Sequence, residues 1–494
     1  MKALLDLAAR HKAGEPCAIY SVCSAHPLVI EATLLHTLRC GAPFALIEAT
    51  SNQVNQEGGY TGMQPESFRR FVHGIADRVG LARDCILLGG DHLGPNPWQA
   101  LPGKDAMARA EALVNDYVRV GFRKMHLDCS MRCADDPATP SDETIARRAA
   151  RLCAIAEAAH ADARGEPPVY VIGTEVPTPG GAAEELSTLA VTTPEAARRT
   201  IDTHRAIFVE AGLGTAWSRV IAAVVQPGVE FNHRKVVAYD SAKARALSRM
   251  IEAYDGLVFE AHSTDYQTPS GLAALVRDHF AILKVGPALT FALREALWAL
   301  DAIEREWIGP ALASGFRDTV MDRLKADPRH WNKYYHARGI ELEYELQYSL
   351  SDRIRYYWSD PQIVHAQGRM FRNLTRRPPP DALISQYLPI AHAALRDGWI
   401  KNSPSELAIA HVSAVLDGYQ AAACLQGRCA SDKAAAPNKA GLGQALEPRP
   451  EPGRVNAAGF PSSPPLTAPP QHHGVEAGFK AGDDADHDRP QWTE

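Results

Sequence analysis

Short apolar runs alternate with longer amphipathic stretches along the first 310 residues. The apolar runs cover residues 17–23, 43–50, 85–92, 124–130, 169–176, 219–226, 256–262 and 281–286. Several of them, such as VIAAVV within the sixth run, are apolar almost throughout. A parallel strand has that pattern when helices cover both of its faces. We therefore predict eight parallel strands.

The stretches between these runs have helical periodicity and helix end signals. Two of them end in glycine, at Gly80 and Gly121, and Ser141 and Thr193 stand where N-cap residues belong. Eight strands that alternate with helices over about 300 residues predict a (β/α)₈ TIM barrel in the α/β class. The alternative is a doubly wound open sheet, which usually has fewer strands and a Gly-rich first turn that this chain lacks.

Two further segments follow the predicted barrel at 1–310. Residues 311–429 are helical in pattern and rich in Arg, Tyr and Trp, so we expect a helical extension packed on the barrel. Residues 430–494 hold ten of the 35 prolines and few large apolar residues. Because such a composition buries too little apolar surface to offset the entropy of ordering, we expect a disordered, low-complexity tail.

Composition and charge exclude several classes of protein. A net charge of −6 argues against nucleic-acid binding, which calls for clustered Lys and Arg. No run of 18 apolar residues is present, which argues against a membrane span, and Asp6 and Arg10 argue against a secretory signal. The nine cysteines show no CxxC spacing, so we expect reduced thiols and a cytoplasmic protein.

Polar residues gather where the predicted strands end, which is the face that carries the chemistry of TIM barrels. These residues are Glu48 and Asn52 after the second strand, Asp91 and His92 at the third, His126 and Asp128 on the fourth, Glu175 on the fifth, His233 after the sixth, and Glu260 and His262 on the seventh. Residues at i and i+2 of a strand share a face. We therefore expect these side chains to meet at one end of the barrel.

Three histidines in this set, His92, His233 and His262, favour a divalent metal site. Asp91, Asp128 and Glu175 lie between them. Imidazole suits zinc and similar metals, and open coordination positions would accept the oxygens of a substrate. The alternative is a polar network that lines the barrel mouth and binds a sugar without metal.

The last two strands of a TIM barrel commonly build a phosphate site. Here Ser263, Thr264 and the backbone at Gly286 are candidates, with the dipole of the next helix, although Asp265 would oppose an anion unless it points away. Ordinary turn and cap residues are the alternative. In YSLSDRIRYYWSDP, Arg353 and Arg355 are candidates for a clamp on phosphate or carboxylate, or else for a partly buried structural face.

Long runs of this sequence resemble a known family. The runs CSAHPLVIEA, LIEATSNQVNQ, GGYTGM, LGGDHLGPN, HLDCSM, VIGTEVPTPGG, VVQPGVEFNH, EAHSTDYQT and YSLSDRIRYYW are similar to those of the GatZ/KbaZ family. Its members are the Z subunits of class II D-tagatose-1,6-bisphosphate aldolase, described as non-catalytic. The resemblance covers about residues 1–425.

The resemblance implies a barrel related to class II aldolases, which use a divalent metal, usually zinc. The Asp–His pair of those enzymes looks like Asp91, the acid/base carboxylate, and His92, a metal ligand. The two later histidine ligands look like His233 and His262, and the glutamate that serves the site looks like Glu175. Zinc is the metal we expect first, with manganese or another divalent ion as the alternative.

The resemblance also implies two functions. The family is described as a partner that stabilises and activates a separate catalytic chain, and some relatives are described as free-standing epimerases of C4 in tagatose 6-phosphate or related ketoses. The C4 proton of a 2-ketose is not acidic, so epimerisation has to break the C3–C4 bond by retro-aldol cleavage and reform it. Asp91 is the first candidate to move the C4 hydroxyl proton and Glu175 the second.

Three hypotheses follow for the function. The chain is a component of tagatose-bisphosphate aldolase with a class II catalytic subunit as partner, or an independent metal-dependent ketose-phosphate 4-epimerase, or a scaffold that binds sugar phosphate only to regulate. Asn52 and Asp128 join the expected substrate contacts, and a homo-oligomer is compatible with each hypothesis. A sugar kinase finds no support, because the sequence contains no GxxxxGK[ST] motif.

Overall fold

The computed structural model describes residues 1–163, 165–174 and 189–423. Glu175 and the predicted tail at 430–494 lie outside the described residues. None of the helices in the described part of the chain is long and apolar enough to cross a membrane.

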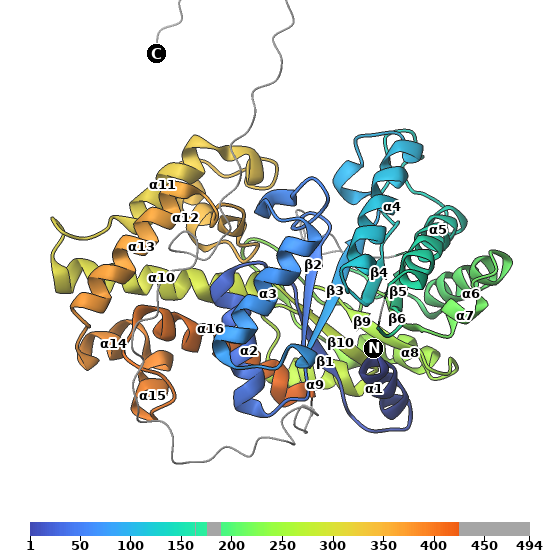
Figure 1. Ribbon diagram of the computed structural model, residues 1–494, viewed down its shortest axis with the longest axis horizontal. Coiled ribbons are helices and arrows are strands. Elements are labelled where there is room, and N and C mark those ends of the chain that lie inside the picture. Colours follow the sequence, from blue (N-terminus) through green and yellow to red (C-terminus); the bar gives the residue numbers. More distant parts are fainter. Residues whose placement is uncertain (164, 175–188, 424–494) are drawn as a thin grey trace, which may run out of the picture. The chain divides into compact units, whose positions relative to one another are not determined.

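Eight parallel strands close into a barrel, which confirms the predicted TIM-barrel fold (Figure 1). The strands are β1 (Ile19–Val22), β2 (Ala45–Thr50), β3 (Ile86–Leu93), β4 (Lys124–Leu127), β5 (Val169–Gly173), β6 (Val220–Val224), β9 (Val258–Ala261) and β10 (Phe280–Val285). Each of them overlaps one of the eight predicted runs. They pair in chain order, and β1 meets β10 with Ser21 opposite Lys284, which closes the barrel.

Helices surround the barrel and connect its strands. They are α1 (Lys2–Lys12), α2 (Pro27–Cys40), α3 (Pro65–Val79), α4 (Gly103–Arg119), α5 (Asp142–Ala161), α6 (Pro194–Glu210), α7 (Gly214–Trp217), α8 (Ser241–Ile251), α9 (Pro269–Arg277) and α10 (Pro287–Ile308). The predicted N-caps are present, because the Ser141 and Thr193 hydroxyls accept the N–H groups of Thr144 and Ala196. Such caps satisfy N–H groups that the first helical turn leaves unpaired.

Two short insertions matter for the site. The 3₁₀ helix η1 (Gly59–Thr61) follows β2, and an antiparallel pair, β7 (Glu230–Phe231) with β8 (Val236–Val237), follows β6. The hairpin at β7 and β8 contains His233 between its two strands. A residue on this hairpin is therefore positioned by the hairpin and not by a barrel strand.

The described residues after α10 are mainly helical (yellow to orange in Figure 1). They form α11 (Phe316–Ala326), α12 (Ile340–Tyr348), the 3₁₀ helix η6 (Arg353–Tyr356), α13 (Pro361–Arg376), α14 (Asp381–Tyr387), α15 (Pro389–Arg396) and α16 (Pro404–Ala423). Helix α16 packs against α2, α9 and α10 of the barrel. At its end, the Ala423 carbonyl accepts the N–H of Ala18, 3.0 Å away, at the entrance to β1. The last described helix therefore belongs to the shell of the barrel.

Candidate functional site

Four charged side chains from strands β2, β4, β9 and β10 meet inside the barrel. Lys124 Nζ lies 2.7 Å from Glu48 Oε1 and 2.6 Å from Glu260 Oε2. Lys284 Nζ forms an ion pair with Glu48 and lies 4.0 Å from Glu260 Oε1. All four side chains are buried. Charges are tolerated in such a place when they are paired, and removal of one partner is costly.

Sequence reasoning missed both lysines. The signal was present, since both lysines belong to runs predicted as buried strands, and Lys284 stands in an otherwise apolar one. Lysine is almost never fully buried without a partner, so a lysine inside an apolar strand predicts a carboxylate nearby. Glu48 and Glu260, which the sequence placed on the second and seventh strands, are those carboxylates.

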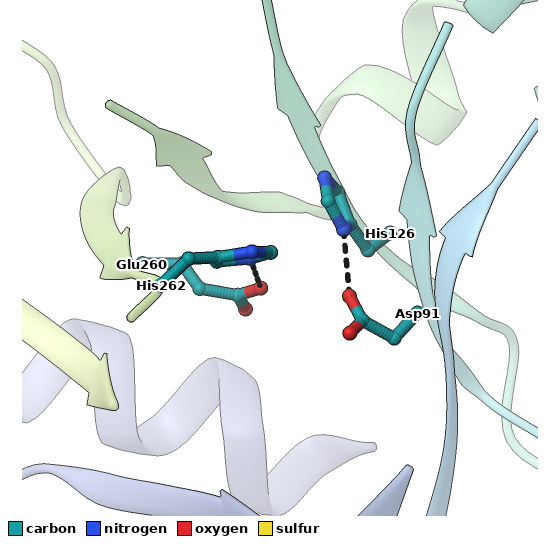
Figure 2. A group of neighbouring side chains, drawn as sticks. All are labelled: Asp91, His126, Glu260 and His262. Atoms are coloured by element: carbon teal, nitrogen blue, oxygen red, sulfur yellow. Dashed lines mark hydrogen bonds and ion pairs between the residues drawn. The ribbon is translucent and has the colours of Figure 1, made fainter. Parts of the chain in front are cut away.

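Above this ion-pair layer, Asp91, His126, Glu260 and His262 point toward one another (Figure 2). Each offers a ligand atom, and these atoms all lie within 4.8 Å of one another. His126 Nδ1 is 2.8 Å from Asp91 Oδ1, and His262 Nε2 is 3.0 Å from Glu260 Oε1. Lys284 Nζ, 3.0 Å from Asp91 Oδ1, links this group to the layer below.

His92 lies beside this group, and Asp128 fixes the orientation of its ring. Its Nδ1 lies 2.7 Å from Asp128 Oδ2, and Asp128 in turn accepts hydrogen bonds from the Ser130 N–H and hydroxyl. The centre of the His92 ring is 5.0 Å from that of His262 and 5.2 Å from that of His126. Backbone angle φ of His92 is 48°, a left-handed conformation that is uncommon outside glycine and worth attention at a functional site.

Electrostatics keep the carboxylates of the site charged. Burial alone would raise the pKa of Asp91, but His92 and Lys284 hold that pKa well below its usual range. The pKa of Glu260 is likewise lowered against burial, by Lys124 and Lys284. Asp91 and Glu260 are therefore ionised at neutral pH, the form in which a carboxylate binds a cation or accepts a proton.

The histidines divide into two kinds. Burial lowers the pKa of His262 to about 4, so this imidazole is neutral at neutral pH. The pKa of His92 is raised although burial opposes its charge, because Asp91 and Asp128 stabilise the imidazolium. Neutral imidazole is the form that binds metals, and a charged His92 suits the stabilisation of negative charge in the cleft.

The residues present fit a divalent cation. His126 Nε2 is buried and has no hydrogen-bond partner among the described residues. Two imidazoles and two carboxylates, from Asp91 and Glu260, form a donor set that suits zinc, manganese or a similar ion. Around them, the three carboxylates of Glu48, Asp91 and Glu260 pair with the two ammonium groups of Lys124 and Lys284, which leaves a surplus of one negative charge for a cation to balance.

Of the three histidines predicted as ligands, the structure brings His92 and His262 together and places His233 elsewhere. His233 lies on the hairpin after β7, where its Nδ1 is 3.4 Å from the hydroxyls of Ser349 and Ser351 and its ring meets Tyr335 edge-on. His126, which shares a strand with Asp128, occupies the group around Asp91 instead. The ligand set of His92, His233 and His262 remains a prediction.

A cleft of about 650 Å³, including the part open to solvent, runs from this group to the extension. Seven predicted residues line it: Asn52, Asp91, His92, His262, Ser263, Gly286 and Arg355. Sequence reasoning missed other lining residues, among them Cys23, Tyr60, Lys284 and Tyr356. The GGYTGM run, which folds as η1, was the available signal for Tyr60.

Asp265 occupies the backbone that we expected to hold a phosphate. Its Oδ1 accepts the N–H groups of Gly286, at 3.0 Å, and Ala288, at 2.8 Å, at the beginning of α10. Thr264 is also engaged, since its hydroxyl donates to the Lys284 carbonyl. Burial raises the pKa of Asp265 to about 6, so it is largely ionised at neutral pH. These N–H groups are therefore already paired.

The two arginines of η6 have different surroundings. Arg355 is half-buried in the cleft wall, where it donates to the carbonyl of Asp352 and to the Tyr356 hydroxyl and has no carboxylate within 4.0 Å among the described residues. Arg353 instead donates to the His330 carbonyl and lies over the ring of Tyr334, outside the cleft lining. A half-buried guanidinium that lines a cleft and has no carboxylate partner is suited to an anionic ligand.

Solved structures of other proteins resemble this one. A protein from Sinorhizobium meliloti 1021, described as a probable tagatose 6 phosphate kinase, is 51% identical over 82% of this chain and 100% of that chain, with a TM-score of 0.76. Fructose-bisphosphate aldolase from Campylobacter jejuni is 15% identical over 72% of this chain and 93% of that chain, with a TM-score of 0.41.

A third likeness is to the fructuronate-tagaturonate epimerase UxaE from Cohnella laeviribosi. It is 14% identical over 82% of this chain and 81% of that chain, with a TM-score of 0.47. This likeness and the one to the aldolase are too distant to bear on function. Residues 4–424 match a family described as D-tagatose-1,6-bisphosphate aldolase subunit GatZ/KbaZ-like, in agreement with the motifs of the sequence. The chain therefore belongs to the GatZ/KbaZ-like family.

Proposed function

We propose that the chain is a component of a class II D-tagatose-1,6-bisphosphate aldolase that acts in tagatose or galactitol catabolism beside a separate catalytic subunit. Membership of the GatZ/KbaZ-like family supports this role. The observation that carries it is the group of Asp91, His126, Glu260 and His262 at the base of a cleft whose lining includes Asn52, Ser263 and Arg355. A chain that only stabilised its partner would have little physical reason to keep these charged groups buried together.

A divalent cation held by these four residues would supply Lewis-acid stabilisation of charge that develops on the oxygens of a ketose. In this proposal zinc is the first candidate and manganese the second. The ligand set predicted from the sequence, His92, His233 and His262, is the competing assignment. His126 distinguishes the two sets, since its unpartnered Nε2 has a use only in the first.

The other groups have roles that follow from their positions. Asp91 Oδ1 is engaged by His126 and Lys284, whereas Oδ2 lies 3.6 Å from His92 Nε2 and 3.7 Å from Cys23 Sγ. Asp91 would take the proton of the C4 hydroxyl through Oδ2 as the C3–C4 bond breaks, and return it when the bond reforms. The electron pair of the broken bond passes to C3 and the C2 carbonyl, where Lys284 and a charged His92 stabilise negative charge. Glu175 remains the second candidate for the proton transfer.

Recognition of the ketose phosphate falls to the outer part of the cleft. Arg355 would bind the phosphate, because it is the lining arginine without a carboxylate partner among the described residues. Asn52 and Ser263 would contact sugar hydroxyls, and Asp128 would act through His92. Gly286 would contribute shape alone, since its N–H is engaged by Asp265.

A second candidate function is a free-standing, metal-dependent 4-epimerase of D-tagatose 6-phosphate or a related ketose. The completeness of the site within one chain favours it, because cleavage and reformation of the C3–C4 bond need one carboxylate and one electrophilic centre. The two functions use the same site and differ in whether the cleaved fragments leave before the bond reforms.

One experiment separates the candidates. The purified chain is incubated with tagatose 6-phosphate and Zn²⁺ or Mn²⁺, and the products are resolved by chromatography. Formation of fructose 6-phosphate by the chain alone supports the epimerase. Inertness of the chain alone, followed by cleavage of tagatose 1,6-bisphosphate that rises when it is added to a class II aldolase chain, supports the aldolase component. Absence of both effects contradicts both candidates.

The variants His126→Ala and His233→Ala test the metal ligands. If His126 binds the cation, its removal lowers the bound metal measured by elemental analysis, while His233→Ala keeps it. The reverse result would favour the set predicted from the sequence. Equal metal content in both variants and in the unchanged protein would contradict both assignments.

A further inference from the structure

A second cluster of metal-binding side chains lies outside the barrel, between helices α2 and α16. It consists of His36 and Cys40, four residues apart on α2, and Asp417 on α16, and their ligand atoms lie within 4.8 Å of one another. Residues at i and i+4 lie on the same face of a helix, as the paired histidines of helical zinc sites do. Cys40 is a free cysteine. The proposed function makes no use of this cluster.

Two of the three distances between ligand atoms in the cluster are close to those of a tetrahedral zinc site. Cys40 Sγ lies 3.6 Å from His36 Nε2, and His36 Nε2 lies 3.0 Å from Asp417 Oδ1. A tetrahedral Zn²⁺ with Zn–S of about 2.3 Å and Zn–N of about 2.0–2.1 Å holds its sulfur and nitrogen ligands about 3.6 Å apart. The same geometry places nitrogen and oxygen ligands about 3.3 Å apart, so a small movement of Asp417 completes the arrangement.

The surroundings of the cluster also suit a metal ion. The other ring nitrogen of His36, Nδ1, is 3.1 Å from the Tyr20 hydroxyl. In the tautomer whose Nδ1–H donates a hydrogen bond to that hydroxyl, the lone pair of Nε2 is free for a metal. The side chain of His36 is fully buried, whereas that of Asp417 is 54% exposed, so an ion can enter from solvent.

Among the described residues, Arg39 is the cationic neighbour that opposes a metal ion. Its guanidinium forms an ion pair with Asp417 Oδ1, and it lies 5.7 Å from the centre of the Trp399 ring. The side chain of Arg39 is 29% exposed and belongs to the surface of α2, so it can turn toward solvent. A metal ion would therefore compete with Arg39 for Asp417, and removal of Arg39 should strengthen metal binding.

We propose that His36, Cys40 and Asp417 form a second site for a thiophilic divalent cation such as Zn²⁺, with one coordination position open to solvent. The site joins α2, the first helix after β1, to α16, the last described helix. A bound ion would fasten α16 to the barrel and stabilise the fold. Its effect reaches the cleft through Tyr419 of α16, which donates to the carbonyl of Thr264, two residues after His262.

Cobalt provides the test, because a thiolate bound to Co²⁺ gives a charge-transfer band in the near ultraviolet. The full chain is titrated with Co²⁺ and then with Zn²⁺, which should displace Co²⁺ and remove the band. The variant Cys40→Ser should lose the band. Loss of a residue that only hydrogen-bonds to a metal ligand weakens metal binding by about 10–100-fold. Because Asp417 would be a ligand itself, Asp417→Asn should weaken Co²⁺ binding by more than that. Arg39→Ala should bind several-fold more tightly.

Two controls separate this site from the cleft. Cys23, which lines the cleft and lies near Glu48 and Asp91, is the matched cysteine, so Cys23→Ser should keep the band. The variant His262→Ala, which removes a candidate ligand of the cleft, should also keep it. A band lost in Cys23→Ser and kept in Cys40→Ser, or no thiolate band in the unchanged protein, would overturn the proposal without affecting the proposed function.

A second readout does not depend on spectroscopy. Zinc should raise the unfolding temperature of the unchanged protein and of Cys23→Ser, because a ligand that binds only the folded state stabilises it by mass action. The increase should shrink in Cys40→Ser. If Cys40→Ser gains as much as the unchanged protein, the stabilisation comes from elsewhere and α2 is not joined to α16 by an ion.

Discussion

At the scale of single residues, the carboxyl of Glu230 is the clearest source of pH dependence. It is buried beside the cleft, and burial raises its pKa from 4.5 to about 7, with a further contribution from the charge of Asp265. The N–H of Phe231 and the hydroxyl of Ser263 oppose the shift without cancelling it. Glu230 therefore carries a proton in the folded protein at a pH where the unfolded chain has lost it.

The sign of the resulting stability change follows from linkage. Because the folded pKa lies above the unfolded value, the contribution of Glu230 is fully present below pH 4.5 and is lost as the pH rises to about 7. The shift corresponds to on the order of 3 kcal/mol. We expect Glu230→Gln to raise the unfolding temperature at pH 8 and to leave it nearly unchanged at pH 4.5. The exposed Glu210, changed to Gln, should show no such difference, and an equal gain at both pH values would contradict the assignment.

Arg355 permits a test of anion recognition that does not depend on turnover. The variant Arg355→Met should weaken binding of a ketose phosphate by about 10–100-fold, since a charge-assisted hydrogen bond contributes about 1.5–3 kcal/mol. Calorimetric titration measures this directly. Arg355→Lys should recover part of the affinity because it keeps the charge and loses the planar donor pair.

Arg353 is the matched control for this measurement. It belongs to the same 3₁₀ helix but lies outside the lining of the cleft. Arg353→Lys should therefore change the affinity for the ketose phosphate by less than about twofold. That corresponds to a change of on the order of 0.4 kcal/mol in the binding free energy. If Arg353→Lys weakened binding as much as Arg355→Lys, the anion site would have to be placed elsewhere.

Sequence reasoning located the acidic and imidazole side chains of the site but not their partners. The i, i+2 spacing of His126 with Asp128 and of Glu260 with His262 correctly put each pair on one face. Whether a side chain on that face lies deep in the barrel or at its mouth depends on the stagger of the strands, which spacing does not contain. For this reason Asp128 could not be recognised as the support of His92.

At the scale of elements, the end of β3 is held close to β4 by a glycine. A Cβ added to Gly94 would lie 1.7 Å from the carbonyl oxygen of Asp128, much closer than any side chain tolerates. The loop after β3 therefore packs on the backbone that presents Asp128. The close approach is available only to glycine.

The variant Gly94→Ala should consequently push β3 and β4 apart at the site. We expect destabilisation of about 1–3 kcal/mol, typical of overpacking, and weaker metal binding in the cleft because Asp91 and His126 move relative to each other. Denaturant unfolding and elemental analysis measure the two effects. Gly74→Ala on α3 is the matched control, since a Cβ there meets no atom within 4 Å, and equal losses in both variants would contradict a local effect.

Elements themselves were well predicted, with one consequential omission. The eight strands and the caps at Ser141 and Thr193 follow from apolar runs and capping chemistry. The two-residue strands β7 and β8 are too short to leave a pattern in the sequence. His233 lies on that hairpin and turns toward Ser351 of the extension, a direction that no periodicity indicates.

At the scale of the whole molecule, α16 decides how the extension is attached. Leu416 on this helix is fully buried, in the core that α16 shares with the barrel shell. Leu416→Ala should destabilise the protein by about 2–5 kcal/mol, because it leaves a cavity between elements far apart in the sequence. Ile390→Ala on α15 should cost within about 0.5 kcal/mol, since that side chain is 47% exposed. Chemical denaturation distinguishes them, and similar losses would show that α16 is not part of the barrel shell.

The sequence predicted a helical extension but not this attachment. Helical periodicity indicates which face of α16 is apolar, and it does not say which neighbour that face meets. The contact depends on the path of the chain through α11 to α15, which no local pattern contains. The hydrogen bond between Ala18 and Ala423 joins residues that are 405 positions apart in the sequence. Helix α16 also packs against α2, which is similarly distant in the sequence.

The pairing of Asp265 with the first N–H groups of α10 has a consequence for how the protein could diversify. Because Asp265 already occupies these N–H groups, the proposed function leaves the phosphate of a ligand to be bound by η6. In that proposal, the residues that make and break bonds lie on the barrel strands. Different segments of the sequence then determine which substrates are accepted and which reaction is catalysed. Exchange of the segment 348–361 between family members should alter which ketoses are accepted and leave the reaction itself unchanged, a practical starting point for engineered sugar conversion.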